Sequence, residues 1–189
     1  SRGGLKLAGA LDAFHISPGG RLCLDVGAST GGFTDVLLQR GARRVVCVDV
    51  GKGLLDWKLR NDPRVTLLEG VNARHLTPEA FAEAAGGEKP TLATVDLAFI
   101  SVTKVLPAVR ALLAPGADLI VLVKPQFEVG KGKVGKGGIV RDPLLHQEAV
   151  ESVWKFAEEN GLNPRARCES PITGTKGNKE FFVWMEKNY

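Results

Sequence analysis

The sequence predicts one α/β domain, built on a mostly parallel sheet with helices on both faces. Five short apolar runs rich in valine and leucine recur along the chain, and segments with helical spacing lie between them. Strands buried on both faces of a parallel sheet have this continuous apolar character, and their alternation with helices is typical of a doubly wound fold. For 189 residues with 44% hydrophobic content, we expect a single domain over residues 1–189.

The expected parallel strands are Arg21–Val26, Arg44–Val50, Arg64–Glu69, Thr91–Leu97 and Ala117–Val123. Segment 33–40 carries apolar residues at helical spacing and is followed by Gly41, the residue type favoured just after a helix. Segment 105–113 has the same spacing and stops before Pro115-Gly116. We therefore expect a helix in each of these connections.

The last third of the chain has a different pattern. A loop rich in glycine and lysine runs to Asp142-Pro143, an N-cap followed by proline at the first helical position, and a helix is expected up to Gly161. Two further β-like runs, Arg165–Ser170 and Glu180–Glu186, follow it. A hairpin-like return needs no crossover helix, so we expect a seven-stranded sheet with an antiparallel C-terminal strand.

Several classes of protein are disfavoured by composition. No window reaches about 18 consecutive apolar residues, and the start of the chain lacks the apolar core of a secretory signal. Cys23, Cys47 and Cys168 form no CxxC pair, and the three histidines show no ligand spacing. We expect a cytoplasmic protein with no membrane contact and no metal. Nothing in the sequence separates a monomer from a homodimer.

Positive charge is concentrated in one glycine-rich segment. The formal net charge is +4, and the stretch "GKGKVGKGG" (130–138) contributes three lysines, Lys131, Lys133 and Lys136, without an acidic residue. Such a local excess indicates contact with a polyanion, and a solvated lysine loop is the alternative interpretation.

A glycine motif, "LDVGASTGGF" (Leu24–Phe33), follows the first expected strand and opens the first helix. Open α/β sheets bind their ligands at this place. A dinucleotide fingerprint starting at Gly27 would need glycine at position 29, where the chain has Ser29, and a P-loop would need a lysine that the motif lacks. A nucleoside-like, cationic ligand without a pyrophosphate remains, and S-adenosylmethionine has these properties.

The expected contacts follow from the strand ends. Asp25 would face the amino acid part of the ligand, and the glycines would let the backbone approach it. Asp49 ends the second strand about 20 residues after the motif, where a carboxylate holds a ribose diol, and Asn72 would bond an adenine edge. The alternative is that these residues only cap helices and turns. The candidate cofactor residues are Asp25, Gly27, Ser29, Thr30, Gly31, Gly32, Phe33, Asp49, Asn72 and Asp96.

Two strand ends carry ionisable residues in apolar surroundings. "ATVDLAFIS" places Asp96 at the end of the fourth strand, and "IVLVKPQFE" places Lys124 at the end of the fifth. Adjacent strand ends project into one crevice, so we expect the two side chains to be neighbours. They form either a purely structural ion pair or a site where Lys124 accepts a proton from an alcohol.

Six stretches together resemble the bacterial TlyA family, part of the wider FtsJ/RrmJ class of ribose 2′-O-methyltransferases. They are "SRGGLKL", "LDVGASTGGFTDVLLQRGA", "VDLAFIS", "LVKPQFEVGKG", "GGIVRDP" and "GNKEFFVW", and they cover nearly the whole chain in order. The resemblance implies a Rossmann-like class I domain that uses S-adenosylmethionine to methylate ribosomal RNA, with the RNA or a ribosomal subunit as partner. It also implies an S4-type RNA-binding domain upstream, so we expect this chain to be a catalytic domain.

The same resemblance implies a Lys–Asp–Lys–Glu catalytic set. By motif it falls on Lys6, Asp96, Lys124 and Glu180. Lys124 would act as base or orienting group, Lys6 would add a second positive charge beside the developing alkoxide, and the two acids would hold the ammonium groups. Phosphate contacts would come from lysine and arginine. The candidate RNA-binding residues are Lys131, Lys133, Lys136, Arg141 and Lys176.

Three other functions remain open at this point. A small-molecule methyltransferase would share Asp25, Asp49 and the fold, but would not need an uncovered lysine loop. A membrane-active toxin is suggested by the label "haemolysin" that the family carries, although no basic amphipathic helix supports it. A noncatalytic RNA-binding module would bind RNA without binding S-adenosylmethionine.

Overall fold

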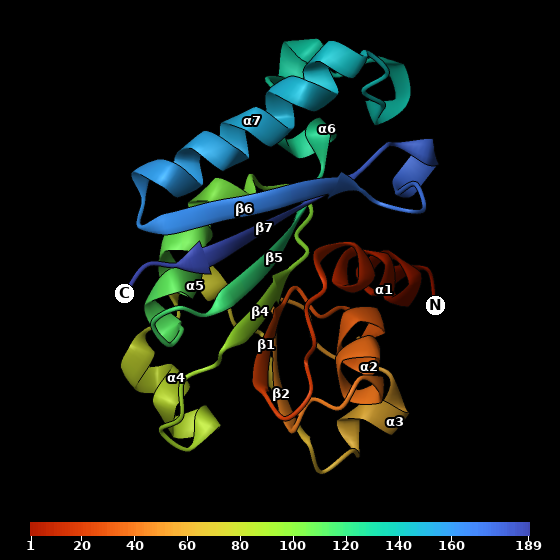
Figure 1. The fold of residues 1–189 in the computed structure, drawn as a ribbon. Coiled ribbons are helices and arrows are strands. Elements are labelled where there is room, and N and C mark those ends of the chain that lie inside the picture. The colour runs from red at the N-terminus through yellow and green to blue at the C-terminus, as the bar shows by residue number, and fades with distance from the viewer.

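The computed structural model describes all 189 residues and contains one seven-stranded sheet with helices on both faces (Figure 1). The strand order is β3-β2-β1-β4-β5-β7-β6. The five expected parallel strands are confirmed, with ends that move by a few residues at most. They are β1 (Leu22–Val26), β2 (Arg44–Asp49), β3 (Val65–Glu69), β4 (Leu92–Val95) and β5 (Asp118–Val123).

The C-terminal strand is antiparallel, as expected. β7 (Phe181–Lys187) lies between β5 and β6 (Leu162–Glu169) and is antiparallel to both. β6 begins three residues before the expected start at Arg165, because Pro164 is accommodated at an irregularity in this edge strand. Since β7 runs against β5, the start of β7 lies at the same edge of the sheet as the carboxyl ends of the parallel strands.

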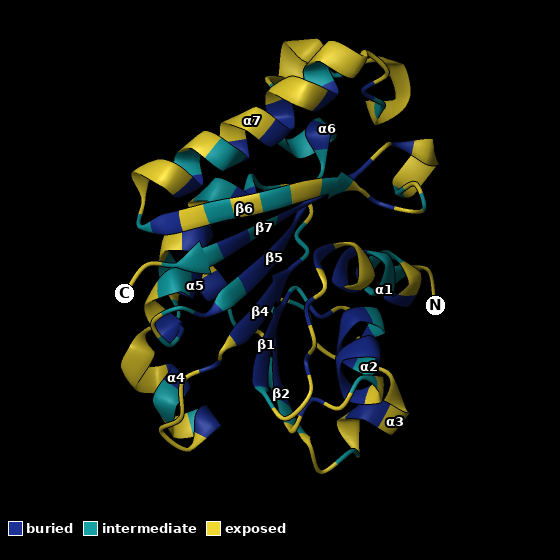
Figure 2. Cartoon of the chain, in the orientation of Figure 1, coloured by how far each residue is buried: buried dark blue, intermediate teal, exposed yellow.

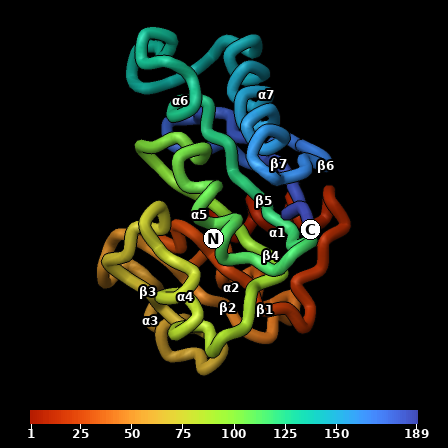
Figure 3. The backbone as a smooth tube through the Cα atoms, turned by 90° about the vertical axis from the view of Figure 1, so that its left-hand side faces the viewer, coloured from red at the N-terminus to blue at the C-terminus, as the bar shows by residue number.

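Two helical layers cover the sheet (Figures 1 and 3). The first contains α1 and α2, with the short α3 beside them, and the second contains α4, α5 and α7. The short α6 follows β5. The helices are α1 (Arg2–Phe14), α2 (Gly32–Gln39), α3 (Trp57–Arg60), α4 (Pro78–Ala85), α5 (Leu106–Leu112), α6 (Pro125–Glu128) and α7 (Pro143–Glu159). Short 3₁₀ turns are η1 (Ala73–His75), η2 (Val102–Lys104), η3 (Lys131–Lys133), η4 (Lys136–Gly138) and η5 (Thr175–Gly177).

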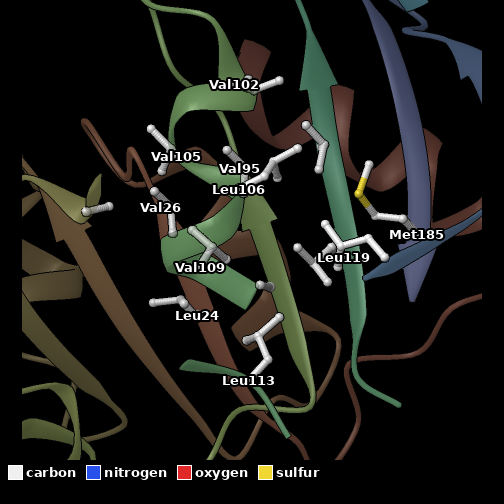
Figure 4. Close-up of a cluster of buried hydrophobic side chains, with 14 of the residues drawn as sticks. Leu24, Val26, Val95, Val102, Val105, Leu106, Val109, Leu113, Leu119 and Met185 are labelled. Atoms are coloured by element: carbon white, nitrogen blue, oxygen red, sulfur yellow. The ribbon is translucent and has the colours of Figure 1, made fainter. Parts of the chain in front are cut away.

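The core lies on both faces of the sheet, as Figure 2 shows in dark blue. On the α5 face, Leu106 and Val109 pack with Val26 and Val95 of the central strands (Figure 4). Successive side chains of a strand point to opposite faces. Leu24 and Val26 therefore face α5, whereas Asp25 faces α2.

Helix α7 begins as the sequence predicts. The Asp142 carboxylate accepts a hydrogen bond from the Leu144 backbone N–H at 2.9 Å, and Pro143 occupies the first helical position. Proline costs nothing there, since the first N–H of a helix has no partner within the helix. No helix of the structure has the length and apolar character needed to cross a bilayer.

Candidate active site

A cavity of about 510 Å³ opens at the carboxyl edge of the sheet. Its walls come from the segments that follow β1, β2, β3, β4 and β5, which is where an open α/β sheet places its ligand. Six of the residues predicted for cofactor binding or catalysis lie in the wall. They are Gly27, Ser29, Asp49, Asn72, Asp96 and Lys124. The volume is in the range of sites that enclose a nucleoside-sized ligand.

The backbone at the centre of this cavity requires a glycine at position 27. Its φ is +82°, and its N–H donates to the Val48 carbonyl at 2.8 Å. A Cβ at this position would lie 1.9 Å from the carbonyl oxygen of Asp96. The loop after β1 can therefore pass the end of β4 only because residue 27 has no side chain.

Asp49 and Asn72 present hydrogen-bonding groups to the cavity. The Asp49 carboxylate accepts from the Ser29 N–H at 2.7 Å and from the Gly51 N–H at 2.8 Å, so each oxygen retains acceptor capacity for a ligand hydroxyl. Asn72 caps η1 through its Oδ1, which accepts from the Arg74 N–H at 3.0 Å. The amide nitrogen of Asn72 has no protein partner and can donate to a ligand.

Asp25 is placed differently from the sequence-based expectation. Its carboxylate is fully buried beneath the loop, accepts from Thr34 Oγ at 2.7 Å and from Thr94 Oγ at 3.1 Å, and does not line the cavity. Desolvation raises the pKa of Asp25 to about 6, against the opposing effect of the two hydroxyl donors. This carboxylate therefore joins β1 to α2 and β4 from inside the domain rather than meeting a ligand directly.

Four other residues of the glycine motif also lie outside the cavity wall. Gly31, at φ +104°, faces Leu55 and Leu59, and Gly32 lies against the start of α1. Phe33 is buried with its ring centroid 6.2 Å from that of Phe182, and Thr30 is exposed. Gly31, Gly32 and Phe33 pack α2 against its neighbours, and spacing alone does not separate this structural use from ligand contact.

Replacing Asp25 by asparagine is expected to change how stability depends on pH. The pKa of Asp25 rises from 3.8 to about 6 on folding, so the folded state binds this proton more tightly than the unfolded state. Ionisation of Asp25 therefore lowers the unfolding free energy as pH rises from about 4 to about 6, by about 3 kcal/mol in total. Urea unfolding at several pH values should show that Asp25→Asn lacks this decline. Parallel pH profiles for the variant and the parent protein would contradict the assignment.

Two short ion pairs bring together the four residues of the predicted catalytic set. Lys124 Nζ lies 2.7 Å from Asp96 Oδ1 in the cavity wall, and Lys6 Nζ lies 2.7 Å from Glu180 Oε1. The Lys124 side chain is 15% exposed and that of Glu180 only 2%. The expectation that Asp96 and Lys124 are neighbours is confirmed.

The sheet register shows why the second pair lies beside the first. Val123 of β5 is paired with Phe181 of β7, and the next position outward on each strand is Lys124 and Glu180. Glu180 is enclosed further by Gly174, where a Cβ would lie 1.9 Å from a Glu180 carboxylate oxygen. Residues 174 positions apart in sequence thus form one charged cluster at the cavity edge.

The sequence analysis did not single out two residues that shape the site, Phe99 and Glu128. Phe99 lines the cavity with 90% of its surface exposed and has a φ of +67°. The centroid of its ring lies 5.3 Å from that of Phe127. Phe99 stands among apolar neighbours in "DLAFIS", so the sequence gives no signal that its ring is exposed.

The carboxylate of Glu128 accepts hydrogen bonds from Ser101 Oγ at 2.6 Å and from the Val102 N–H at 3.0 Å. Burial raises the pKa of this carboxyl group. Glu128 therefore ties the segment after Asp96 to the helix after Lys124, which helps to hold those two residues in register.

The predicted RNA-binding residues form a separate group at the same end of the molecule and do not line the cavity. Lys133 pairs with Glu148 at 2.9 Å, and Lys176 donates to the Gly137 carbonyl at 2.9 Å. The Lys131–Lys136 loop is anchored by buried Asn178, which bonds Gly138 and Val140. Since Asn178 lies two residues before Glu180, the loop is held near the predicted catalytic set.

The fold and the cavity define a class of enzyme. A doubly wound sheet with an inserted antiparallel last strand, a glycine turn at the first strand end and a carboxylate at the second is the architecture of S-adenosylmethionine-dependent methyltransferases. The residues present fit this cofactor. Asp49 can accept from ribose hydroxyls, Asn72 can donate to adenine, and Gly27 lets the backbone approach.

The chain belongs to the FtsJ-like methyltransferase family, whose profile matches residues 1–187. It is 54% identical over 185 residues to the 16S/23S rRNA (cytidine-2′-O)-methyltransferase TlyA of Mycobacterium tuberculosis H37Rv, covering 98% of this chain and 67% of that protein. It is 42% identical to Hemolysin A of Brachyspira hyodysenteriae, covering 97% and 75%. A solved Streptococcus thermophilus structure, described as a candidate hemolysin, superposes with a TM-score of 0.94 at 45% identity, covering 100% and 66%. The chain thus spans about two thirds of the length of the first and last of these relatives.

Proposed function

We propose that this chain transfers the methyl group of S-adenosylmethionine to a ribose 2′-hydroxyl of ribosomal RNA. The observation that carries the proposal is the Lys124–Asp96 pair in the wall of the cavity, with the Lys6–Glu180 pair beside it. A relative that is 54% identical is named as a cytidine 2′-O-methyltransferase of 16S and 23S rRNA. The substrate places the activity in the cytoplasm, and the chain would serve as the catalytic domain of such an enzyme.

The chemistry divides between cofactor and protein. S-adenosylmethionine supplies an electrophilic methyl group on a sulfonium centre. Asp49, Asn72 and the Gly27 backbone would hold the nucleoside part, and Asp96 lines the cavity in an ion pair with the Lys124 amine. This arrangement fixes the position of the amine before the hydroxyl arrives, which is an entropic contribution to the rate.

Lys124 is the proposed acceptor of the 2′-hydroxyl proton. The 2′-hydroxyl proton would pass to Nζ of Lys124 once the ammonium group has released a proton to solvent, while Asp96 orients the amine. Lys6, held by the buried carboxylate of Glu180, contributes the positive charge that stabilises the developing alkoxide. The partly exposed Lys124 side chain then gives the proton to solvent.

The RNA strand would be held around the cavity by charge and by stacking. Phe99 offers an exposed ring at the cavity wall, and aromatic side chains stack on unpaired bases. The lysines of the 130–138 loop, with Arg141 and Lys176, would contact phosphates beside the catalytic cluster. Phosphate contacts of this kind position RNA without reading its sequence.

A methyl-transfer assay tests the proposed function. Labelled S-adenosylmethionine and deproteinised ribosomal RNA or intact subunits are incubated with the protein, and the RNA is digested to nucleosides for mass spectrometry. We expect a nucleoside carrying the label on its ribose oxygen. A methyl group on a base, or transfer only to small molecules, would overturn the proposal.

Neutralising the lysine loop distinguishes RNA methylation from small-molecule methylation. The triple variant Lys131→Gln, Lys133→Gln, Lys136→Gln is expected to raise the KM for RNA and to make its salt dependence shallower, by about 2 in the log–log slope for three lost contacts. Its kcat at saturating RNA should stay near the parent value. If the turnover and the salt slope of the variant equal those of the parent protein, the result would support a small-molecule substrate.

A further inference from the structure

A second cavity lies beside the C-terminal strands, apart from the cofactor cavity. It has a volume of about 420 Å³ and is formed between the first turns of α7 and strands β6 and β7. Figures 1 and 3 show α7 running along β6 in this region. None of its lining residues lines the cofactor cavity. We refer to it as the α7 groove.

Positive charge dominates the rim of the α7 groove. The lining contains three cations, Arg141, Arg167 and Lys179, and a single carboxylate, that of Glu169. Arg141 makes no hydrogen bond or ion pair within the protein. Lys179 is 3.6 Å from Glu169, and both side chains are more than half exposed, so the ammonium group is free to turn toward a phosphate. Exposed pairs of this kind contribute little to stability.

The floor of the α7 groove is apolar and partly aromatic. The rings of His146 and Phe181 lie 5.7 Å apart between centroids, and Val150 completes the floor. His146 Nε2 is already engaged with the Val140 carbonyl at 2.7 Å, so the imidazole serves as a packed surface rather than a free titrating group. Arg167 lies 5.8 Å from the centre of the Trp154 ring, which holds its guanidinium at the groove edge.

Cations above an apolar, aromatic floor match one kind of ligand. Single-stranded nucleic acid presents phosphates along one side and flat apolar bases along the other, and proteins bind it with basic grooves that contain stacking surfaces. A protein segment would not need three cations around the rim, and a closed metabolite site would enclose its ligand more fully. The net charge of the rim, three cations against one carboxylate, favours a polyanion.

The position of the groove connects it to the catalytic end. Arg141 follows the lysine loop directly, and Val140 is bonded to Asn178, two residues before Glu180. On the sheet, Phe181 of the groove floor is paired with Val123, the residue before Lys124. The cations of the lysine loop and those of the α7 groove therefore adjoin through Arg141.

We propose that the α7 groove binds an unpaired nucleotide of the RNA substrate outside the methylation site, with phosphates on Arg141, Arg167 and Lys179 and the base on the apolar floor. The proposal rests on the proposed function for the identity of the polyanion. It assigns to Arg167 and Lys179 a role in RNA binding that neither composition nor the catalytic cluster indicates.

A charge-matched pair of variants tests the groove. The groove variant is Arg167→Gln, Lys179→Gln, which leaves Arg141 and the lysine loop intact, and the control variant removes two exposed lysines that line neither cavity, Lys58→Gln, Lys89→Gln. Fluorescence anisotropy with a labelled single-stranded RNA of about 30 nucleotides reports binding without requiring catalysis. We expect the groove variant to bind about tenfold more weakly, with a salt slope lower by about 1, and the control variant to change far less.

A comparison of long and short RNA substrates distinguishes binding in the α7 groove from binding at the active site. For methyl transfer, the groove variant should raise the KM of a long RNA but not of a short fragment that reaches only the cofactor cavity, with kcat unchanged for both. Equal behaviour of the groove and control variants, or equal effects on long and short RNA, would overturn the proposal. So would competition by free AMP at concentrations far below those of RNA phosphate, since that result assigns the groove to a mononucleotide.

The two proposals fail in different ways. If the parent protein binds RNA through the groove but transfers no methyl group to it, the proposed function is wrong and the groove stands. If methyl transfer to RNA occurs and the groove variant matches the control, the proposed RNA binding in the α7 groove is wrong and the proposed function stands. Melting temperatures of both variants near that of the parent exclude loss of fold as the cause.

Discussion

Replacing Lys124 by alanine is expected to reduce methyl transfer by about 10²–10⁴-fold, the contribution of a positioned proton acceptor. Lys124 is the one lysine in the wall of the cofactor cavity, and its amine lies 2.7 Å from Asp96. Removing it leaves Asp96 without its cation, but the Asp96 side chain is 28% exposed and can be hydrated. The fold and the affinity for S-adenosylmethionine should therefore change little, as circular dichroism and calorimetry can check.

An arginine at the same position separates proton transfer from charge. Arginine keeps the positive charge and can pair with Asp96, but it is not deprotonated in proteins. If Lys124 accepts the proton, Lys124→Arg should be nearly as inactive as Lys124→Ala. If the residue only neutralises charge, the arginine variant should recover a large part of the activity, and the proposed role of the amine would be wrong.

Lys104 offers a control for the loss of an exposed cation near the same loop. It lies in η2, close in sequence to the Asp96 segment, and makes no ion pair. Lys104→Ala should leave kcat at the parent value. A comparable loss of activity in this variant would indicate a general electrostatic effect in place of a specific role for Lys124.

The elements that the sequence predicts well are those with a local signal. Each parallel strand is a continuous apolar run, and the polar residue that ends it, such as Asp49 or Lys124, is placed by topology at one edge of the sheet. The parity of side chains along a strand also decides that Asp25 faces α2, but its burial depends on hydroxyl donors 9 and 69 residues away. No spacing rule within the glycine motif carries that information.

The features that the sequence does not predict depend on contacts between residues far apart in the chain. The Lys6–Glu180 pair joins residues 174 positions apart, so its assignment depended on family resemblance, and the register of β5 with β7 supplies its physical reason. The α7 groove draws on residues from a loop, a helix and two strands, none of which forms a motif. Phe99 is conspicuous only when its exposure and its positive φ are seen together.

Replacing Gly27 by alanine is expected to give the largest loss of structure at the site. The new Cβ would lie 1.9 Å from the Asp96 carbonyl oxygen, and the φ of +82° is strained for any residue with a side chain. The clash is with backbone, so the ends of β1 and β4 must separate. Strain and overpacking together should cost about 2–4 kcal/mol, which corresponds to a fall in melting temperature of about 5–15 °C for a chain of this size.

Gly87 provides a matched control for the strain alone. Its φ of +83° is nearly the same as that of Gly27, but nothing lies within 4 Å of a Cβ built on it. Gly87→Ala should therefore cost only about 1 kcal/mol, from the left-handed backbone conformation, and should leave cofactor binding unchanged. The difference between the two variants measures the close approach of the two strand ends.

Cofactor affinity is the second measurement for Gly27→Ala. Separation of β1 from β4 displaces Asp96 and Ser29 together, because both flank the cavity at this contact. Titration calorimetry at a temperature where the variant is folded should show S-adenosylmethionine binding weakened by at least about tenfold, the effect of 1.4 kcal/mol. A variant that matches Gly87→Ala in both melting temperature and cofactor affinity would show that the β1–β4 contact does not shape the cofactor site, and the assignment of the cavity would have to be withdrawn.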